Sequence, residues 1–285
     1  MDFELADRVI VVTGGASGIG LAVAREAARQ GARVAIIDSS QDQSASAVAE
    51  LKAAGARAVA EVLDVRDAAA CEAATIRIEQ ALGPIDGLVA CAGTSRPEPA
   101  EAMTDDTWDA VLGINLTGLF RSIRPAATRM IARGRGAIVT ISSTDGLGGH
   151  AGRSHYAASK HGVVGLTRSL AIEWGRHGVR VNAVAPGVVD TPLLRRNIPV
   201  EHIENAMIDR VPIGRFSTAL EQANACLFLL SDAASYINGA TLAVDGGLTA
   251  GYFTRWGGAD LGSNALLERG VYARPAAALS TSTKD

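Results

Sequence analysis

Short apolar runs that alternate with alanine-rich stretches of helical length constrain the fold of this chain more than any other feature. Several runs are continuously apolar, which is typical of parallel strands covered by helices on both faces. The runs predict strands at Arg8–Thr13, Arg33–Asp38, Arg57–Leu63, Gly87–Cys91, Ala137–Ser142, Arg180–Ala185 and Thr241–Val244. The stretches between them predict helices near residues 18–30, 42–54, 67–82, 104–133, 155–176 and 219–231. This order predicts an α/β fold, a single doubly wound domain with a seven-stranded, mostly parallel sheet and helices on both faces.

No shift in composition marks a linker, so residues 1–249 are predicted to form one domain. Within it, residues 187–216 hold three prolines and interrupt the alternation, which makes them a candidate substrate loop. Residues 250–285 extend beyond the last strand, and their small, polar end is expected to be disordered. The first part of this extension holds the aromatic residues Tyr252, Phe253 and Trp256, which are expected to pack rather than stay in solvent. They could contact the substrate loop or a neighbouring subunit, or they could simply anchor the extension to the protein surface.

Composition excludes several classes of function. A net charge of −3 and a pI of about 6.0 give no electrostatic footprint for nucleic acid or an anionic membrane. The chain starts without the features of a signal peptide, and no apolar run approaches the about 18 residues of a membrane span. Cys71, Cys91 and Cys226 are scattered and predict neither disulfides nor a metal site. We expect a cytoplasmic protein that acts on a small molecule.

A glycine-rich turn follows the first predicted strand. It reads Thr13-Gly14-Gly15-Ala16-Ser17-Gly18-Ile19-Gly20, and a helix begins at once. Glycines in such a turn let the backbone approach a pyrophosphate, whose charge is met by N–H groups of the turn and of the helix N-terminus. The spacing differs from the G-x-G-x-x-G form, but the sequence of strand, turn and helix predicts a dinucleotide site.

Asp38 ends the second predicted strand, 18 residues after Gly20. A carboxylate there can accept hydrogen bonds from both ribose hydroxyls and repels a 2′-phosphate. Ala16, Ser17, Ser39 and Ser40 offer no positive charge that could hold such a phosphate. These positions predict NAD as the cofactor; the alternative is that Asp38 only caps the following loop.

Tyr156 and Lys160 lie four residues apart at the start of a predicted helix and therefore share one of its faces. A neighbouring ammonium stabilises a phenolate and is expected to lower the pKa of the tyrosine, which makes it a usable proton shuttle. Ser143 follows the strand Ala137–Ser142, at the carboxyl edge where open α/β sheets bind ligands. Its hydroxyl could hold the oxygen of an alcohol or carbonyl.

Residues 5–249 carry these motifs in the order of the short-chain dehydrogenase/reductase family, which the chain resembles. The resemblance implies a Rossmann fold and a catalytic tetrad of Asn115, Ser143, Tyr156 and Lys160. It implies a cofactor site formed by Gly14, Ser17, Gly18, Ile19, Gly20, Asp38, Asp64, Val65, Ala92, Gly93, Asn115, Tyr156, Lys160, Pro186, Gly187, Val189 and Thr191. Cys91 stands where the family usually has asparagine, and we interpret it as a small hydrophobic residue.

The resemblance further implies how the tetrad works. Tyr156 would exchange the hydroxyl proton, Lys160 would lower the pKa of Tyr156 and bind the nicotinamide ribose, and Ser143 would hold the substrate oxygen. Asn115 would hold a water that links Lys160 to solvent. A homotetramer is also implied, and the predicted helix 104–133 carries more apolar residues than one sheet face would cover.

Five residues between Ser143 and Tyr156 could line a substrate pocket, although a solvated loop or a subunit contact is favoured for them. They are Asp145, Leu147, His150, Arg153 and His155. Arg133 and Arg135, on either side of Gly134, are interpreted as surface charges.

The sequence thus predicts an NAD-dependent short-chain alcohol dehydrogenase or ketone reductase, an oxidoreductase that transfers a hydride between NAD(H) and a secondary alcohol or ketone. Candidate substrates are cyclic alcohols, dihydrodiols, sugars, steroids and 3-oxoacyl groups. Two alternatives stay open. A nucleotide-sugar epimerase or dehydratase is disfavoured by the short segment after Pro186, and a non-catalytic dinucleotide-binding sensor is disfavoured by the intact tetrad.

Overall fold

The computed structural model describes residues 3–203 and 207–251. Tyr252, Phe253, Trp256 and the rest of the C-terminal extension lie outside the described residues, so what the sequence predicts for them stays a prediction.

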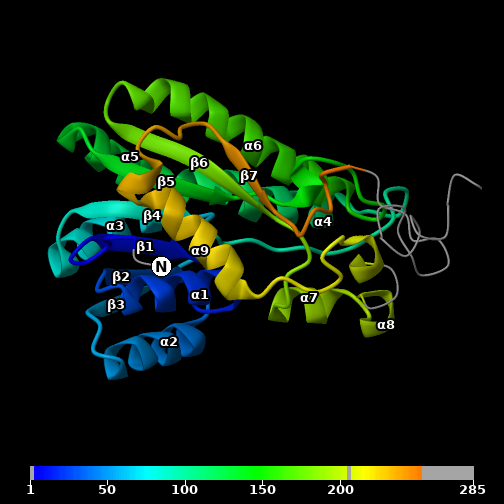
Figure 1. Cartoon of the computed structure of the whole chain (residues 1–285), viewed down its shortest axis with the longest axis horizontal. Coiled ribbons are helices and arrows are strands. Elements are labelled where there is room, and N and C mark those ends of the chain that lie inside the picture. The colour runs from blue at the N-terminus through cyan, green and yellow to red at the C-terminus, as the bar shows by residue number, and fades with distance from the viewer. Residues whose placement is uncertain (1–2, 204–206, 252–285) are drawn as a thin grey trace, which may run out of the picture.

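A seven-stranded parallel sheet forms the centre of the structure, in the order β3-β2-β1-β4-β5-β6-β7 (Figure 1). Every described strand pairing is parallel. The strands are β1 (Val9–Thr13), β2 (Arg33–Asp38), β3 (Ala58–Val62), β4 (Ile85–Ala90), β5 (Gly136–Ile141), β6 (Val179–Pro186) and β7 (Thr241–Val244). The predicted fold class is confirmed. The strand order reverses between β1 and β4, the position at which doubly wound sheets bind ligands.

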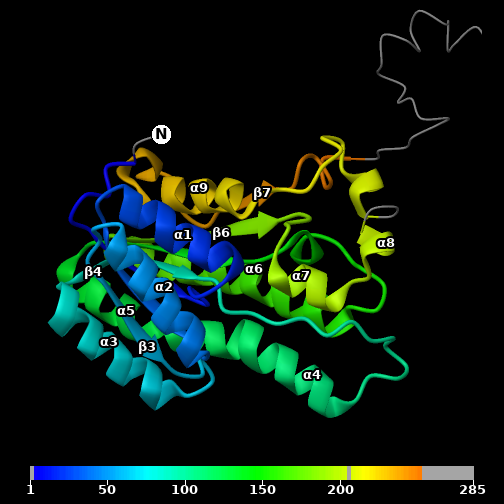
Figure 2. The ribbon, with the colours of Figure 1, turned by 90° about the horizontal axis from the view of Figure 1, so that it is seen from below.

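Helices cover both faces of the sheet (Figures 1 and 2). One face carries α1 (Gly18–Arg29), α2 (Gln41–Ala53) and α9 (Ala219–Leu230), and the other carries α3 (Ala68–Leu82), α5 (Leu119–Arg133) and α6 (Ser154–Gly175). Ile10 and Val12 of β1 pack into the first core, whereas Val9 and Val11 pack into the second. Because neighbouring side chains of a strand point to opposite faces, a strand buried on both faces is apolar at each position.

The predicted helix 104–133 is wrong in one respect, because a wide turn divides it. α4 (Asp105–Leu112) runs into a π-helical turn, η1 (Gly113–Gly118), before α5 begins. A Cβ atom on Gly118 would lie 2.7 Å from Cγ2 of Val65, so the turn passes close to the loop after β3. The turn holds Asn115, which is fully buried, and π turns are frequent at functional sites.

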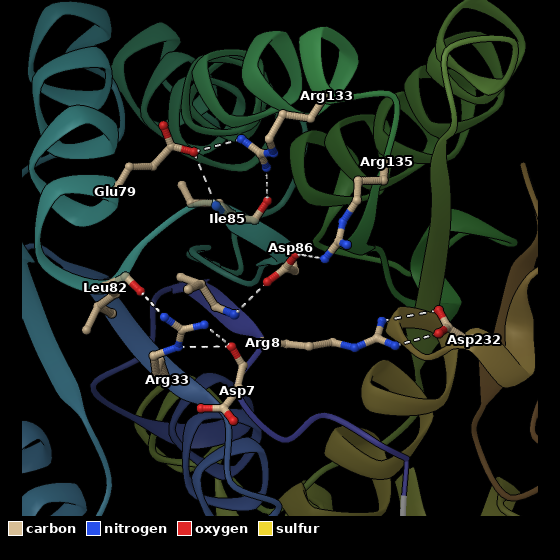
Figure 3. A network of polar contacts seen from close by, with 11 residues as sticks. Asp7, Arg8, Arg33, Glu79, Leu82, Ile85, Asp86, Arg133, Arg135 and Asp232 are labelled. Atoms are coloured by element: carbon tan, nitrogen blue, oxygen red, sulfur yellow. Dashed lines mark hydrogen bonds and ion pairs between the residues drawn. The ribbon is translucent and has the colours of Figure 1, made fainter.

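Ion pairs tie together the amino edge of the sheet (Figure 3). Arg8 pairs with Asp232 at 2.5 Å, and Asp86 accepts hydrogen bonds from the backbone N–H of Val9 and from Arg135. Arg133 donates to Glu79 at 2.9 Å and to a backbone carbonyl of β4. Arg135 is a surface charge, as predicted, because its side chain is 70% exposed, and its pair with Asp86 contributes about 0–1 kcal/mol. Arg133 is 27% exposed and bridges α5 to Glu79 of α3 and to β4, so it is more than a surface charge.

The segments after β5 and β6 lie beyond the carboxyl edge of the sheet (Figure 1). They include η2 (Thr144–Gly146), α7 (Pro192–Asn197), α8 (Val200–His202) and η4 (Ile208–Arg210), and η5 (Asp232–Ala234) follows α9. α9 begins with a capping box, in which Thr218 and Glu221 each accept a hydrogen bond from the other's backbone N–H. A hydrogen bond from Arg215, with the capping bonds from Thr218, lowers the pKa of Glu221 to about 2. Within the described ranges, no helix combines the length and hydropathy needed to cross a membrane.

Candidate active site

A cavity of about 1070 Å³ opens at the carboxyl edge of the sheet. Its volume exceeds that of many single-ligand pockets. All but two of the residues predicted for the site line it: Gly14, Ser17, Gly18, Ile19, Asp38, Asp64, Val65, Ala92, Gly93, Ser143, Tyr156, Lys160, Pro186, Gly187, Val189 and Thr191. Gly20 and Asn115 do not line the cavity, but they contact residues that do.

The glycine turn packs against the loop after β4. Gly14 has a φ of +63°, and a Cβ atom there would lie 2.8 Å from the Cα of Ala92. A Cβ on Gly20 would lie 2.1 Å from the carbonyl oxygen of Gly14, so α1 could not approach the turn with any larger residue. The hydroxyl of Thr13 accepts hydrogen bonds from the N–H groups of Cys91 and Ala92, both at 3.1 Å. These contacts fix the backbone that a pyrophosphate would approach.

Asp38 lies at the end of β2 with its carboxylate held by the backbone. One oxygen accepts the N–H of Ala16 and the other accepts the N–H of Ser40, both at 3.1 Å. It therefore caps the next loop, as the alternative interpretation required, and it also lines the cavity. Each oxygen keeps a second lone pair for a ribose hydroxyl. The neighbouring lining residues Ser39, Ser40 and Gln43 are uncharged.

Asp64 lines the cavity after β3 and pairs with Arg66 at 2.6 Å. The hydrogen bond from Arg66 lowers the pKa of the Asp64 carboxyl, and both carboxylate oxygens accept hydrogen bonds from Arg66.

Tyr156, Lys160 and Ser143 converge at the deeper part of the cavity. The ammonium of Lys160 lies 5.6 Å from the centre of the Tyr156 ring and donates to the carbonyl oxygen of Ile141 at 2.8 Å. The hydroxyl of Ser143 accepts the N–H of Asp145 at 3.1 Å and lies close enough to the Tyr156 phenol to lower its pKa. The predicted juxtaposition of a phenol, an ammonium and a hydroxyl is therefore present.

The predicted lowering of the Tyr156 pKa is wrong for this structure. Burial raises the pKa of the phenol, and the hydrogen bond with Ser143 and the charge of Arg153 oppose that rise only in part. Burial also lowers the pKa of Lys160 to about 8. Desolvation disfavours the charged form of both groups, and the sequence motif alone does not reveal how strongly it acts.

Asn115 holds the loop after β4. Its side-chain oxygen accepts the N–H of Thr94 at 2.8 Å, and its amide donates to the carbonyl of Thr94 at 2.9 Å and to the Ser159 hydroxyl at 3.2 Å. Thr94 and the neighbouring Gly93 both line the cavity. Asn115 thus positions the cavity wall through the backbone. The water-holding role implied by the resemblance stays a prediction.

The segment between Ser143 and Tyr156 lines the cavity, as the pocket-lining alternative predicted, whereas a solvated loop or a subunit contact was the favoured interpretation. Asp145, His150 and Arg153 all line it, and Asp145 pairs with Arg153 at 3.5 Å and with His150 at 3.4 Å. His155 is fully buried, and neither ring nitrogen has a hydrogen-bond partner within the described residues. Leu147 is 41% exposed, as expected for a loop residue. The available signal was the position of this segment between two site residues.

Cys91 lines the cavity at the end of β4. Burial raises the pKa of its thiol to about 11, so the thiolate is scarce at neutral pH. This supports the interpretation of Cys91 as a small hydrophobic residue.

The predicted substrate loop forms one wall of the cavity. Val189 and Ser217 form a bridge between its two ends. Between these ends, residues that line the cavity include Leu193, Leu194, Arg196, His202, Met207 and Arg210. The loop thus supplies both apolar and basic side chains to the site.

The chain is similar to proteins of known function. A family model described as enoyl-(acyl carrier protein) reductase matches residues 14–249. The cis-4-hydroxycyclohexanecarboxylate dehydrogenase of Sinomonas cyclohexanicum is 46% identical over 88% of this chain and 100% of its own. The levodione reductase of Leifsonia aquatica is 40% identical over 87% of this chain and 97% of its own. The structure of a gluconate 5-dehydrogenase from Burkholderia cenocepacia, in complex with NADP and tartrate, matches with a TM-score of 0.84 and 36% identity, over 88% of this chain and 98% of its own.

Proposed function

The chain belongs to the short-chain dehydrogenase/reductase family, and from this premise we propose that it transfers a hydride between a nicotinamide dinucleotide and a secondary alcohol or ketone. The observation that carries the proposal is the convergence of Ser143, Tyr156 and Lys160 in the cavity that the glycine turn and Asp38 also line. The relatives named above are dehydrogenases and a reductase. This favours hydride transfer over the epimerase or dehydratase alternative, and over a sensor without turnover.

Each of the main residues of the cavity has its own role in such a reaction. The nicotinamide, when bound, supplies the acceptor or donor of the hydride. Ser143 holds the substrate oxygen beside the phenol of Tyr156, which removes the hydroxyl proton in oxidation and returns it in reduction. Lys160, fixed by its hydrogen bond to the Ile141 carbonyl, places a positive charge near the phenolate as it forms. Asn115 keeps the wall at Thr94 in position.

The cofactor is NAD in this proposal. Asp38 is placed by two backbone N–H groups and faces the cavity among uncharged neighbours. A 2′-phosphate brought against that carboxylate meets a like charge and finds no cation on Ser39, Ser40 or Gln43. Two structural neighbours, both described as gluconate 5-dehydrogenases, were solved with NADP bound, so the choice of NAD for this chain rests on Asp38 and its uncharged neighbours.

We expect a homotetramer. Within the helix 104–133, Leu119, Ile123 and Met130 are buried in the chain's own core, but Leu112, Ile114 and Phe120 are only partly buried and remain available to a subunit contact. Further support comes from Ile172 on α6, which is 76% exposed, and from the edge strand β7, where Leu242 is 38% exposed. Apolar side chains at such positions are typical of subunit contacts. Light scattering at micromolar concentration that shows a monomer would contradict this assembly.

A reducing compartment such as the cytoplasm is also part of the proposal. Cys71, Cys91 and Cys226 are all unpaired in the structure. Extracellular proteins of this size more often join their cysteines in disulfides.

One experiment tests the proposed function. The protein is supplied with NAD and a panel of secondary alcohols, and NADH formation is followed by absorbance. Tyr156→Phe should lower turnover by about 10²- to 10⁴-fold, the range of acid–base catalysis, and leave NADH affinity within a few-fold of the unmodified protein. Turnover above about a tenth of the original rate in Tyr156→Phe rules out the phenol as the catalyst.

A further inference from the structure

Charged side chains are unevenly distributed along the cavity. Asp38 and Asp64 line it after β2 and β3, at one side of the sheet. Arg153, Arg196 and Arg210 line it from the segments after β5 and β6, at the other side. Among the described lining residues of these two segments, Asp145 is the one carboxylate. The side that receives the substrate therefore attracts an anion.

Arg153 is the arginine closest to the proposed chemistry. Its guanidinium carbon lies 5.4 Å from the centre of the Tyr156 ring, and its side chain is only 12% exposed. Arginines that stack on an aromatic ring keep the edge of the guanidinium free for hydrogen bonds. A group bound to Arg153 thus lies beside the residue that exchanges the substrate proton.

The hydrogen bonds of Arg153 are incomplete. Its pair with Asp145 is 3.5 Å long, whereas charge-assisted bonds are usually about 2.7–2.9 Å. The pair of Arg195 with Asp190, at 2.8 Å, shows the ordinary length elsewhere in this chain. A guanidinium has five N–H donors, and leaving them unpaired in a mostly buried site is unfavourable. Asp145 orients the side chain, and most of its donors remain available to a ligand.

The rest of the substrate side combines apolar and polar side chains. Its apolar residues are Leu193, Leu194, Met207 and Leu248, and its polar residues include Thr144, Asn197, His202 and Thr249. The apolar residues can contact a hydrocarbon skeleton.

We propose that Arg153 binds a carboxylate of the substrate, so that the secondary alcohol or ketone is a hydroxy or oxo carboxylic acid with an apolar skeleton. This inference rests on the proposed function and names its substrate class. A carboxylate matches the planar fork of a guanidinium in a two-bond pair. Arg153 is the residue that determines specificity in this arrangement, and Asp145 is a positioning residue. The catalytic role stays with Tyr156.

Matched substrates test the inference. Alicyclic and linear secondary alcohols of several lengths are each supplied as the carboxylate and as the carboxamide, with NAD and with NADP. In the unmodified protein, at least one skeleton should give a kcat/KM about 10- to 100-fold higher for the carboxylate, the range of a hydrogen bond to a charged group. Arg153→Met should bring this ratio near unity, mainly through KM, and Arg153→Lys should restore part of it. If Arg153 had a purely structural role, Arg153→Met would lower kcat/KM equally for the carboxylate and the carboxamide.

Arg57→Met is the matched control, because Arg57 is exposed near the start of β3 and does not line the cavity. It should keep the original ratio. Carboxamides that react as well as carboxylates in the unmodified protein would overturn the inference and leave the proposed function intact.

A binding measurement decides the inference if no alcohol turns over and the proposed function fails. Cyclohexanecarboxylate and cyclohexanecarboxamide are titrated into the NADH-loaded protein, and NADH fluorescence is followed. Tighter binding of the carboxylate that is lost in Arg153→Met supports the inference, and equal affinities refute it.

Discussion

Replacing Asp38 with asparagine should change which cofactor the protein prefers. The amide oxygen of asparagine can still accept one of the two backbone N–H bonds that now hold the carboxylate at 3.1 Å. Much of the local geometry is therefore kept, and the negative charge is lost. The variant isolates the electrostatic part of the discrimination between NAD and NADP.

The size of the effect follows from the position of the carboxylate. A 2′-phosphate at about 4 Å from Asp38 is repelled by about 1 kcal/mol per unit charge in water, and by about 4 kcal/mol at the effective dielectric constant of a protein surface. Asp38 is only half-buried, so the lower part of that range applies. We therefore expect NAD to be preferred by at least about tenfold in kcat/KM, which corresponds to about 1.4 kcal/mol.

The assay compares kcat/KM for NAD and NADP with one alcohol, at low and at high ionic strength. Asp38→Asn should reduce the preference by about tenfold, and salt should reduce it in the unmodified protein, because exposed charges are screened. Asp42→Asn is the control, since Asp42 carries the same charge on the exposed first turn of α2 and does not line the cavity. Equal use of both cofactors by the unmodified protein, or an unchanged ratio in Asp38→Asn, would refute the reasoning.

Four further predictions concern the site and its support. The rate of alcohol oxidation should rise with pH as Tyr156 ionises. Arg153→Met should move that rise to higher pH, because the charge of Arg153 lowers the pKa of the phenol. The pH dependence of the rate with an uncharged alcohol checks this, and a shift of the rise to lower pH contradicts it. Asn115→Ala leaves the N–H and carbonyl of the loop after β4 without their partner, and it should lower the free energy of unfolding in urea by about 1–3 kcal/mol and weaken cofactor binding. Unchanged stability would show that the loop does not depend on this residue. Thr218→Ala should cost about 1 kcal/mol at pH 7 through loss of the α9 cap. The pKa of Glu221 in the folded protein is about 2, below its ordinary value of 4.5. The stabilisation from its carboxylate is therefore complete above pH 4.5 and is lost as the pH falls toward 2. In urea unfolding, the difference in free energy of unfolding between Glu221→Gln and the unmodified protein should shrink below pH 4.5.

The sequence determined where the strands lie along the chain, the parallel sheet and most of the predicted site residues that line the cavity. Continuous apolar runs such as Val9–Thr13 report burial on both faces, and this information is local to each run. The glycine turn, Asp38 and the pair of Tyr156 and Lys160 were predictable for a similar reason, since strand ends and helix spacing fix where such residues lie.

Only the tertiary structure decided what surrounds each of these groups. Asn115 was assigned by resemblance, but its bonds to Thr94 and Ser159 join segments far apart in the chain. The π turn that holds it was not predicted, because residues 104–133 were interpreted as one continuous helix. For Arg153 a solvated loop or a subunit contact was favoured, because its position in the chain does not show that it packs beside Tyr156 and Asp145. The pKa of Tyr156 moved opposite to the motif's prediction because desolvation depends on all neighbours at once, and those neighbours come together only when the chain is folded.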